Sequence, residues 1–160
     1  MEAEDLAAEY ETLVLPRFDE WAALTLGFGL VETARAAGAP VVIDIRTADR
    51  VLFHVALPGA TPLNDLWVAR KAATALLFQK PSLLVGVEHR AKGGTLADHG
   101  LSLATHADHG GAVPVRVAGT GVVACVTVSG LPQVEDHRMA VEGLRSLKTR
   151  LDGPDPQAGV

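Results

Sequence analysis

Hydrophobic and polar residues alternate most clearly within residues 109–137, and the predicted fold is organised around this stretch. Over residues 113–117, valines alternate with Pro114 and Arg116, a period of two that is typical of a half-buried β-strand. Residues 122–128 are almost entirely apolar, as expected of a strand that is covered on both faces. The pattern therefore predicts two neighbouring strands at the centre of a sheet.

The segments that join and follow these strands predict a hairpin and a helix. Gly119 and Gly121 lie in the short connection between the two strands, where a tight turn favours glycine. Ser129 and Gly130 interrupt the second strand, and Pro132 suits the first position of a helix. We expect that helix to lie across the hairpin.

The remaining pattern predicts an α+β chain. Asp19 is a suitable N-cap and Gly38 a suitable C-terminal stop for a long helix in which Trp21 and Phe28 share one apolar stripe and Leu26 lies on another. Such a helix should be buried around much of its circumference. In chain order, the expected elements are helices at 2–13 and 20–37, strands at 41–46 and 51–57, a helix at 65–79, a helical or mixed segment at 81–90, an irregular stretch at 91–101, the hairpin strands at 113–117 and 122–128, and a last helix at 132–151. We expect a single domain over residues 1–151 and a disordered tail over residues 152–160.

Charge and composition exclude several classes of protein. The formal net charge is −5 and the basic residues are scattered, which argues against a nucleic-acid surface. No apolar span is long enough for a membrane helix and the acidic start is unlike a signal peptide, so we predict a soluble, cytoplasmic protein. The one cysteine, Cys125, lies within a predicted strand and is expected to be buried and inert.

Several short motifs together resemble a known family. They are Leu57-Pro58-Gly59, Asn64, Trp67, Arg70-Lys71, Gly110-Gly111, Pro114, Gly119-Thr120-Gly121, Val128-Ser129-Gly130-Leu131-Pro132 and Glu135-Asp136-His137. This pattern resembles uncharacterised protein family three hundred and three, a branch of the haem-degrading-domain superfamily with GlcG, HbpS and the PduO C-terminal domain. The resemblance spans roughly residues 13–150.

The resemblance implies a fold, an assembly and a ligand class. It implies a profilin-like α/β (α+β) fold, with a central antiparallel sheet of about five strands and helices packed on its faces. It also implies a homo-oligomer, either a dimer or an assembly of dimers. Relatives are linked to haem or corrinoid binding, so haem, a related tetrapyrrole or a small anion is the implied ligand, and no reaction is established for this branch.

Four of the six histidines, His89, His99, His106 and His109, lie close together in sequence. Neutral imidazole suits haem iron and transition metals, so this window is a candidate for either. The spacing of His106 and His109 matches no recognised metal motif, because they precede a strand rather than sharing a helix face. We therefore predict no dedicated metal site, with these two as the candidates for one. The alternative is that the histidines are polar loop residues at a surface or subunit contact.

A second candidate group combines a basic helix with a pair of glycines. Arg70 lies one turn after Trp67 on one helix face, beside Lys71, and the three side chains either bind an acidic ligand or pack a subunit interface. Gly110 and Gly111 precede a strand, where their N–H groups either face an anion or only form a turn. Together these five residues and His109 are our candidate ligand-binding set.

The acidic motif before the last helix has two interpretations. In one, Glu135, Asp136 and His137 form an acid–base group. In the other, Glu135 and Asp136 stabilise the helix start with their negative charge, and His137 faces the sheet and bonds an acceptor. We favour the second, and group Asp136 and His137 with Pro114, Gly119, Gly121, Ser129, Gly130 and Pro132 as structural motif residues. The N–H groups near Ser129 and Gly130 are open to the same anion-or-turn alternatives.

Three hypotheses for function remain open. The first is an oligomeric module that binds a small anion or tetrapyrrole near Gly110 and Arg70. The second is an enzyme that carries out redox or degradative chemistry on such a ligand, although no nucleophile–base pair is evident from the sequence. The third is an assembly protein in which the motifs serve only the fold and the oligomer.

Overall fold

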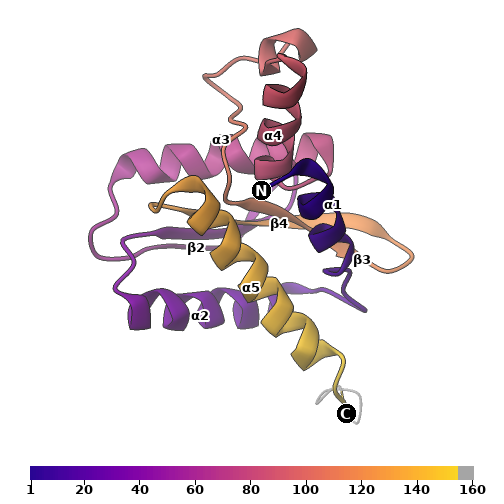
Figure 1. Ribbon diagram of the computed structural model, residues 1–160. Coiled ribbons are helices and arrows are strands. Elements are labelled where there is room, and N and C mark those ends of the chain that lie inside the picture. Colours follow the sequence, from indigo (N-terminus) through magenta and orange to yellow (C-terminus); the bar gives the residue numbers. More distant parts are fainter. Residues whose placement is uncertain (155–160) are drawn as a thin grey trace.

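The computed structural model describes residues 1–154, so the last part of the predicted tail, 155–160, lies outside the described residues. Within them the chain forms five α-helices, one 3-10 helix and four strands (Figure 1). The elements are α1 (Ala3–Glu11), α2 (Glu20–Ala37), β1 (Val42–Arg46), β2 (Val51–Ala56), α3 (Pro62–Phe78), α4 (Ser82–Lys92), η1 (Leu96–His99), β3 (Ala112–Val117), β4 (Gly121–Ser129) and α5 (Gln133–Leu151). The predicted element types are confirmed, and the stretch at 91–101 that was expected to be irregular contains the 3-10 helix η1.

The four strands form one antiparallel sheet in the order β2-β1-β4-β3. The predicted β3–β4 hairpin is confirmed, but its position is corrected, because β1 pairs with the other side of β4 and leaves β3 at an edge. The expected count of about five strands is also corrected to four. The only further pairing in the described residues is an isolated parallel bridge between Leu15 and Val117. In this bridge the Leu15 N–H donates to the carbonyl oxygen of Arg116, and the Ala118 N–H donates to the carbonyl oxygen of Leu15, both at 2.9 Å.

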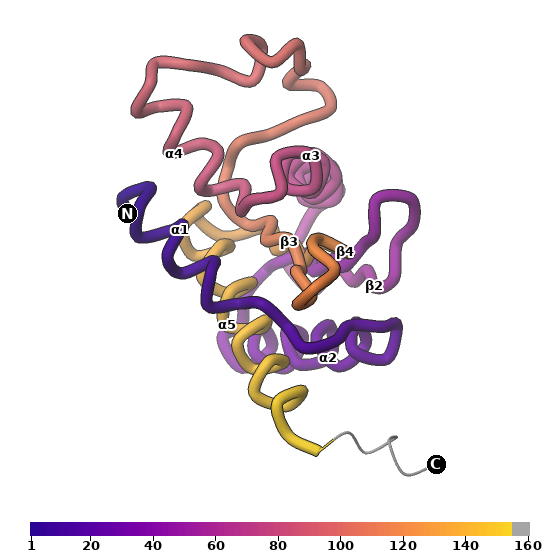
Figure 2. Tube along the Cα trace, turned by 90° about the vertical axis from the view of Figure 1, so that its right-hand side faces the viewer, coloured from indigo at the N-terminus to yellow at the C-terminus, as the bar shows by residue number. Residues whose placement is uncertain are grey.

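Helices cover both faces of the sheet, as predicted. Figure 1 shows α3 on one side and α2 on the other, with α5 crossing the second face obliquely, and Figure 2 shows the same three layers from the side. The larger core lies under α2 and α5, where Leu30, Val126 and Leu144 are fully buried. The opposite face packs small residues of α3, among them Ala72, against Cys125. Small side chains on that face let α3 lie close to the sheet.

The packing of α2 corrects one expectation. Asp19 caps the helix through the Ala22 N–H at 2.8 Å, and Leu26 is buried, as predicted. Trp21 and Phe28, however, are 65% and 60% exposed. Because α2 lies on the outer surface of its layer, only one of its two apolar stripes can face the sheet.

The segment from α4 through η1 to the start of β3 extends away from the layered body, as both views show (Figures 1 and 2). Its root is packed, because Leu83 and Leu84 of α4 are buried against Leu6 of α1. None of the helices in residues 1–154 combines the length and the apolar character that crossing a bilayer requires.

Candidate functional site

A cleft of about 220 Å³ lies between the first half of α3 and the start of α5. The segment before β3 and the link after β4 complete its walls. Its lining residues are Asn64, Trp67, Lys71, His109, Ser129, Gly130, Leu131, Gln133 and Asp136. Three of the predicted ligand-binding residues and three of the predicted structural ones thus meet around one cavity.

The floor of the cleft holds a buried ion pair between Lys71 and Asp136. Lys71 Nζ lies 3.1 Å from Asp136 Oδ2 and also donates to the carbonyl oxygen of Val128 at 3.2 Å. The two charged side chains are only 4% and 2% exposed. Burial lowers the pKa of Lys71 and raises that of Asp136, while their mutual attraction opposes both shifts. Because the two residues are 65 positions apart, no local pattern in the sequence predicts their pairing.

Backbone N–H groups hold the Asp136 carboxylate on its other side. Leu131 N–H donates to Oδ1 at 2.9 Å and Gly130 N–H donates to Oδ2 at 3.3 Å. In the same way, Gly110 N–H donates to Gln133 Oε1 at 2.9 Å. Two of the N–H groups that were candidates for an external anion, those of Gly110 and Gly130, therefore donate to side chains of the protein itself, which agrees with the turn interpretation of these two glycines.

Gly111 permits the close approach on which the ion pair depends. Its φ of 137° lies in a region that favours glycine. A Cβ at this position would overlap the carbonyl oxygen of Val128 and lie 2.8 Å from Lys71 Nζ. Only glycine leaves room for the ammonium group here.

The mouth of the cleft is aromatic, because Trp67 and His109 line it, and Arg70, which is not a lining residue, lies beside Trp67. The Arg70 guanidinium lies 4.5 Å from the centre of the Trp67 ring, which confirms the predicted neighbours, and Arg70 Nε donates to the carbonyl oxygen of Leu103 at 2.7 Å. His109 meets Trp67 edge to face, with ring centres 5.0 Å apart. Burial lowers the pKa of His109, and nearby cations including Lys71 and Arg70 lower it further against the effect of Asp108. The imidazole of His109 is therefore neutral near pH 7.

Other candidate residues lie outside the cleft. His106 bonds its neighbour Thr105 at 2.8 Å, and no group of three or more His, Cys, Asp or Glu side chains in residues 1–154 is arranged to hold a metal. His137 is buried and its Nε2 pairs with Glu9 at 2.8 Å, which confirms that it faces inward and bonds an acceptor. Pro114 lies in β3, while Gly119 and Gly121 form the β3–β4 turn with positive φ.

Two lining residues could not be assigned to the cleft from the sequence. Asn64 lies in the first turn of α3, where its side chain accepts the N–H of the N-cap residue Thr61 at 3.0 Å. Gln133 could not be predicted as a site residue, because its contact with Gly110 forms only when the start of β3 and the end of β4 lie side by side in the folded chain.

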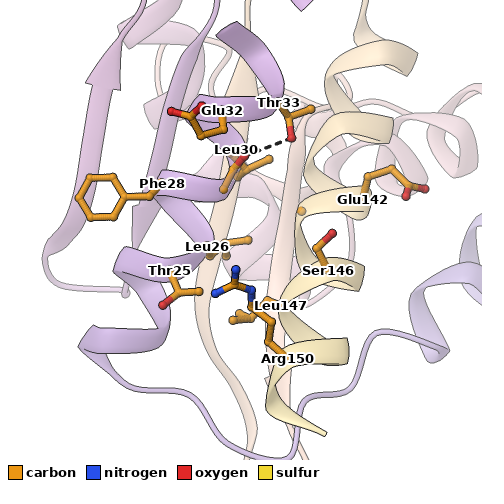
Figure 3. Close-up of a pocket in the computed structure, with 12 residues that line it drawn as sticks. Thr25, Leu26, Phe28, Leu30, Glu32, Thr33, Glu142, Ser146, Leu147 and Arg150 are labelled. Atoms are coloured by element: carbon orange, nitrogen blue, oxygen red, sulfur yellow. Dashed lines mark hydrogen bonds between the residues drawn. The ribbon is translucent and has the colours of Figure 1, made fainter. Parts of the chain in front are cut away.

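A larger hollow, of about 560 Å³, lies between α2 and α5 on the opposite face (Figure 3). Apolar residues such as Leu26 and polar or charged ones such as Glu142 and Arg150 line it in equal share. Figure 3 shows the Phe28 ring pointing away from the groove. No residue of the candidate ligand-binding set lies in it. Since the smaller cleft gathers the buried charges and the aromatic mouth, we take the smaller cleft as the candidate site.

Comparisons with known proteins agree with this architecture. A family model described as haem degrading protein HbpS-like matches residues 18–145. A UPF0303 protein of Streptomyces coelicolor is 51% identical over 141 residues, which cover 88% of this chain and 89% of that protein. The crystal structure of the Ybr137w protein has a TM-score of 0.84 at 30% identity, covering 94% of this chain and 89% of that one. A double mutant of HbpS from Streptomyces reticuli has a TM-score of 0.68 at 26% identity, covering 82% and 87%.

Proposed function

The chain belongs to the HbpS-like family of haem degrading proteins and to the UPF0303 proteins. We propose that it is a binding module for a small carboxylate ligand, which is held in the cleft between α3 and α5. The observation that carries the proposal is the environment of Lys71. Its ammonium group has three hydrogens, and two are donated to Val128 and Asp136. The third has no partner among the described residues, and Lys71 lines the cleft.

The mouth of the cleft supports the same ligand class. Arg70 uses Nε for Leu103, so its remaining guanidinium donors are available above Trp67. A carboxylate that enters beside Trp67 would meet Arg70 at the rim and Lys71 at the floor. Asp136 does not oppose this arrangement strongly, because three donors already compensate its charge.

Binding can be followed through Trp67 itself. The chain has two tryptophans, so a Trp21→Phe background leaves Trp67 as the only one that reports by fluorescence. We expect titration with succinate to change this fluorescence in a saturable way. Arg70→Gln should weaken binding by about tenfold, since a hydrogen bond to a charged group contributes about 1.5–3 kcal/mol. Arg145→Gln, an exposed arginine on α5, is the matched control and should have no effect. Equal binding by the Arg70 variant would contradict the proposal.

A haem ligand is the second candidate, and the family description favours it. His109 is half exposed and neutral near pH 7, which suits an axial ligand. The cleft does not enclose a whole macrocycle, because its volume of about 220 Å³ is below the roughly 300–1,000 Å³ of pockets for larger ligands. A haem would therefore contact the cleft through an edge or a propionate and be covered by something else.

Haem binding is tested by its absorption. Adding haem to the chain should shift the Soret band at one equivalent, and His109→Ala should abolish the shift while His106→Ala, a nearby histidine outside the cleft, preserves it. A shift no larger than that given by serum albumin, or one retained in His109→Ala, would remove haem from the proposal.

We favour binding over catalysis as the function of this cleft. The Asp136 carboxylate is held by three donors, and His109 Nδ1 lies 3.8 Å from Asp108, which is too long for an activating hydrogen bond. Turnover of haem with a reductant, lost in His109→Ala, would instead establish the enzymatic alternative.

The proposal includes assembly into a homo-oligomer in the cytoplasm, on the profilin-like fold that the resemblance implies. Leu63 and Leu66 are 59% and 62% exposed on α3, beside the cleft residues Asn64 and Trp67. A second copy that covered them would also narrow the open side of the cleft. Light scattering should give a mass of two or more chains, and Leu66→Glu should reduce it. A monomeric wild-type chain would refute this part while leaving ligand binding to be decided by the titration.

A further inference from the structure

A second group of side chains that could bind a ligand lies on the extended segment, away from the cleft. His89 of α4 is almost fully buried, and its Nε2 lies 3.1 Å from Nε2 of His99 at the end of η1. On the other side of the ring, His89 Nδ1 lies 2.9 Å from Asp108 Oδ2. Three residues from separate parts of the segment thus form a chain of carboxylate, imidazole and imidazole.

Asp108 determines which nitrogen of His89 is free to bind. A carboxylate can only accept at Nδ1, so the His89 proton lies there and the Nε2 lone pair faces His99. The same arrangement, in which a carboxylate orients a histidine, recurs behind metal-bound histidines in proteins. The backbone of Asp108 packs closely against α4 at Gly86, where a Cβ would overlap the carbonyl oxygen of Asp108. This close contact fixes the position of Asp108.

The separation of the two nitrogens fits a shared ion. Two nitrogens that are each about 2.0 Å from a tetrahedral ion lie about 3.3 Å apart. The observed 3.1 Å is close to that value, and the ring planes are tilted by 33°, with centres 5.2 Å apart. The arrangement therefore needs little movement to admit an ion in place of the hydrogen that the two nitrogens now share.

The surroundings limit how the rings can move and what can complete the site. Phe78 packs edge to face against both imidazoles, with ring centres 6.0 Å from His89 and 5.0 Å from His99. Asp108 bonds the far nitrogen of His89, and no group of three or more His, Cys, Asp or Glu side chains in residues 1–154 is arranged to hold one ion, so the protein itself supplies two ligands. Since His99 is exposed, water can occupy the remaining positions around an ion.

We propose that His89 and His99 form a binding site for a divalent transition metal of the zinc or copper class, with Asp108 as the residue that orients His89. Imidazole ligands suit these ions, and the open positions leave the bound metal accessible to a further ligand. On binding, His99 Nε2 gives up its hydrogen and Nδ1 carries it instead, so the ring stays neutral.

The site is tested by zinc titration of the full chain near neutral pH, followed by calorimetry. We expect one Zn²⁺ per chain. His99→Gln should weaken binding at least tenfold, and Asp108→Asn should weaken it about 10–100-fold through the orientation of His89. His106→Gln is the matched control, because His106 belongs to the same loop region and has no contact with the pair, and it should bind zinc as the wild type does.

A second measurement separates this site from nonspecific uptake. Cu²⁺ bound to the wild type should show hyperfine coupling to two nitrogens in electron paramagnetic resonance, and His99→Gln should reduce this to one. The far-UV circular dichroism of each variant shows whether it is folded. Unchanged zinc affinity in folded His99→Gln, or an equal loss in His106→Gln, would overturn the assignment. Neither result bears on the cleft, which shares no residue with the pair.

Discussion

The buried pair of Lys71 and Asp136 allows the sharpest test of how this structure is stabilised. Asp136→Asn keeps the shape of the side chain but leaves a buried ammonium without a countercharge. Removing one partner of such a pair costs about 3–5 kcal/mol, because the remaining charge stays desolvated. The exposures of 4% and 2% place this pair fully in that class. For a chain of this size, the loss corresponds to a fall of about 10 °C in the melting temperature.

Removing the other partner, Lys71, should lower the free energy of unfolding by less. In Lys71→Met the alkyl volume is kept, and the Asp136 carboxylate retains the N–H groups of Gly130 and Leu131. The double variant removes both charges, so it should be more stable than the sum of the two single losses predicts, by about 2 kcal/mol.

Urea denaturation of the four proteins measures this cycle directly. Arg145→Ala, which removes an exposed ion pair with Glu142, is the control and should cost less than about 1 kcal/mol. If Asp136→Asn unfolds within about 0.5 kcal/mol of the wild type, or the two single losses simply add, the pair is not the buried, coupled element described above.

Three further predictions concern other parts of the fold. Burial alone would lower the pKa of His54, but hydrogen bonds to Asp44 and Asp65 outweigh it and raise the pKa above 6.5. His54 therefore stabilises the fold fully below pH 6.5, and this contribution is lost as pH rises through the raised value. The difference in unfolding free energy between wild type and His54→Gln should shrink as pH rises above 6.5, and a constant difference would refute this prediction. Burial raises the pKa of the Cys125 thiol to about 12, so iodoacetamide should label it only after unfolding in urea, and rapid labelling of the native chain would contradict the buried placement. Gly111→Ala should lower the free energy of unfolding by more than about 2 kcal/mol, because the added Cβ would overlap the carbonyl oxygen of Val128 and the backbone would be strained. Thermal melting measures this loss, and a near-native melting temperature would show that the neighbouring backbone can move.

Much of the fold was predictable because its signals are local. The Asp19 cap, the glycine at the end of α2 and the valine alternation of β3 each depend on residues within a few positions. The order of strands was not predictable in the same way. That β1 lies between β2 and β4 depends on contacts over about eighty residues, such as Ile43 with Val128, and no local pattern records them.

The candidate site divides along the same line. Trp67, Lys71 and His109 were predicted as one set, and the cleft does bring them together. Asp136 does lie in the first turn of α5, as expected, but its pairing with Lys71 at the floor of the cleft was not predicted. Whether a charged side chain is buried depends on residues that are distant in the sequence, so the burial of Lys71 and Asp136 could not be predicted from the sequence.

The two edges of the sheet are not equivalent, and this limits how the molecule can add to itself. At β3, Leu15 occupies part of the outer edge, and Pro114 removes one donor from it. β2 has no such protection among the described residues, so it alone offers a full row of free backbone groups to another chain. If two molecules paired through β2, the free backbone groups of both β2 strands would be occupied. Sheet extension through β2 would therefore end with a closed dimer and would not continue into a fibre.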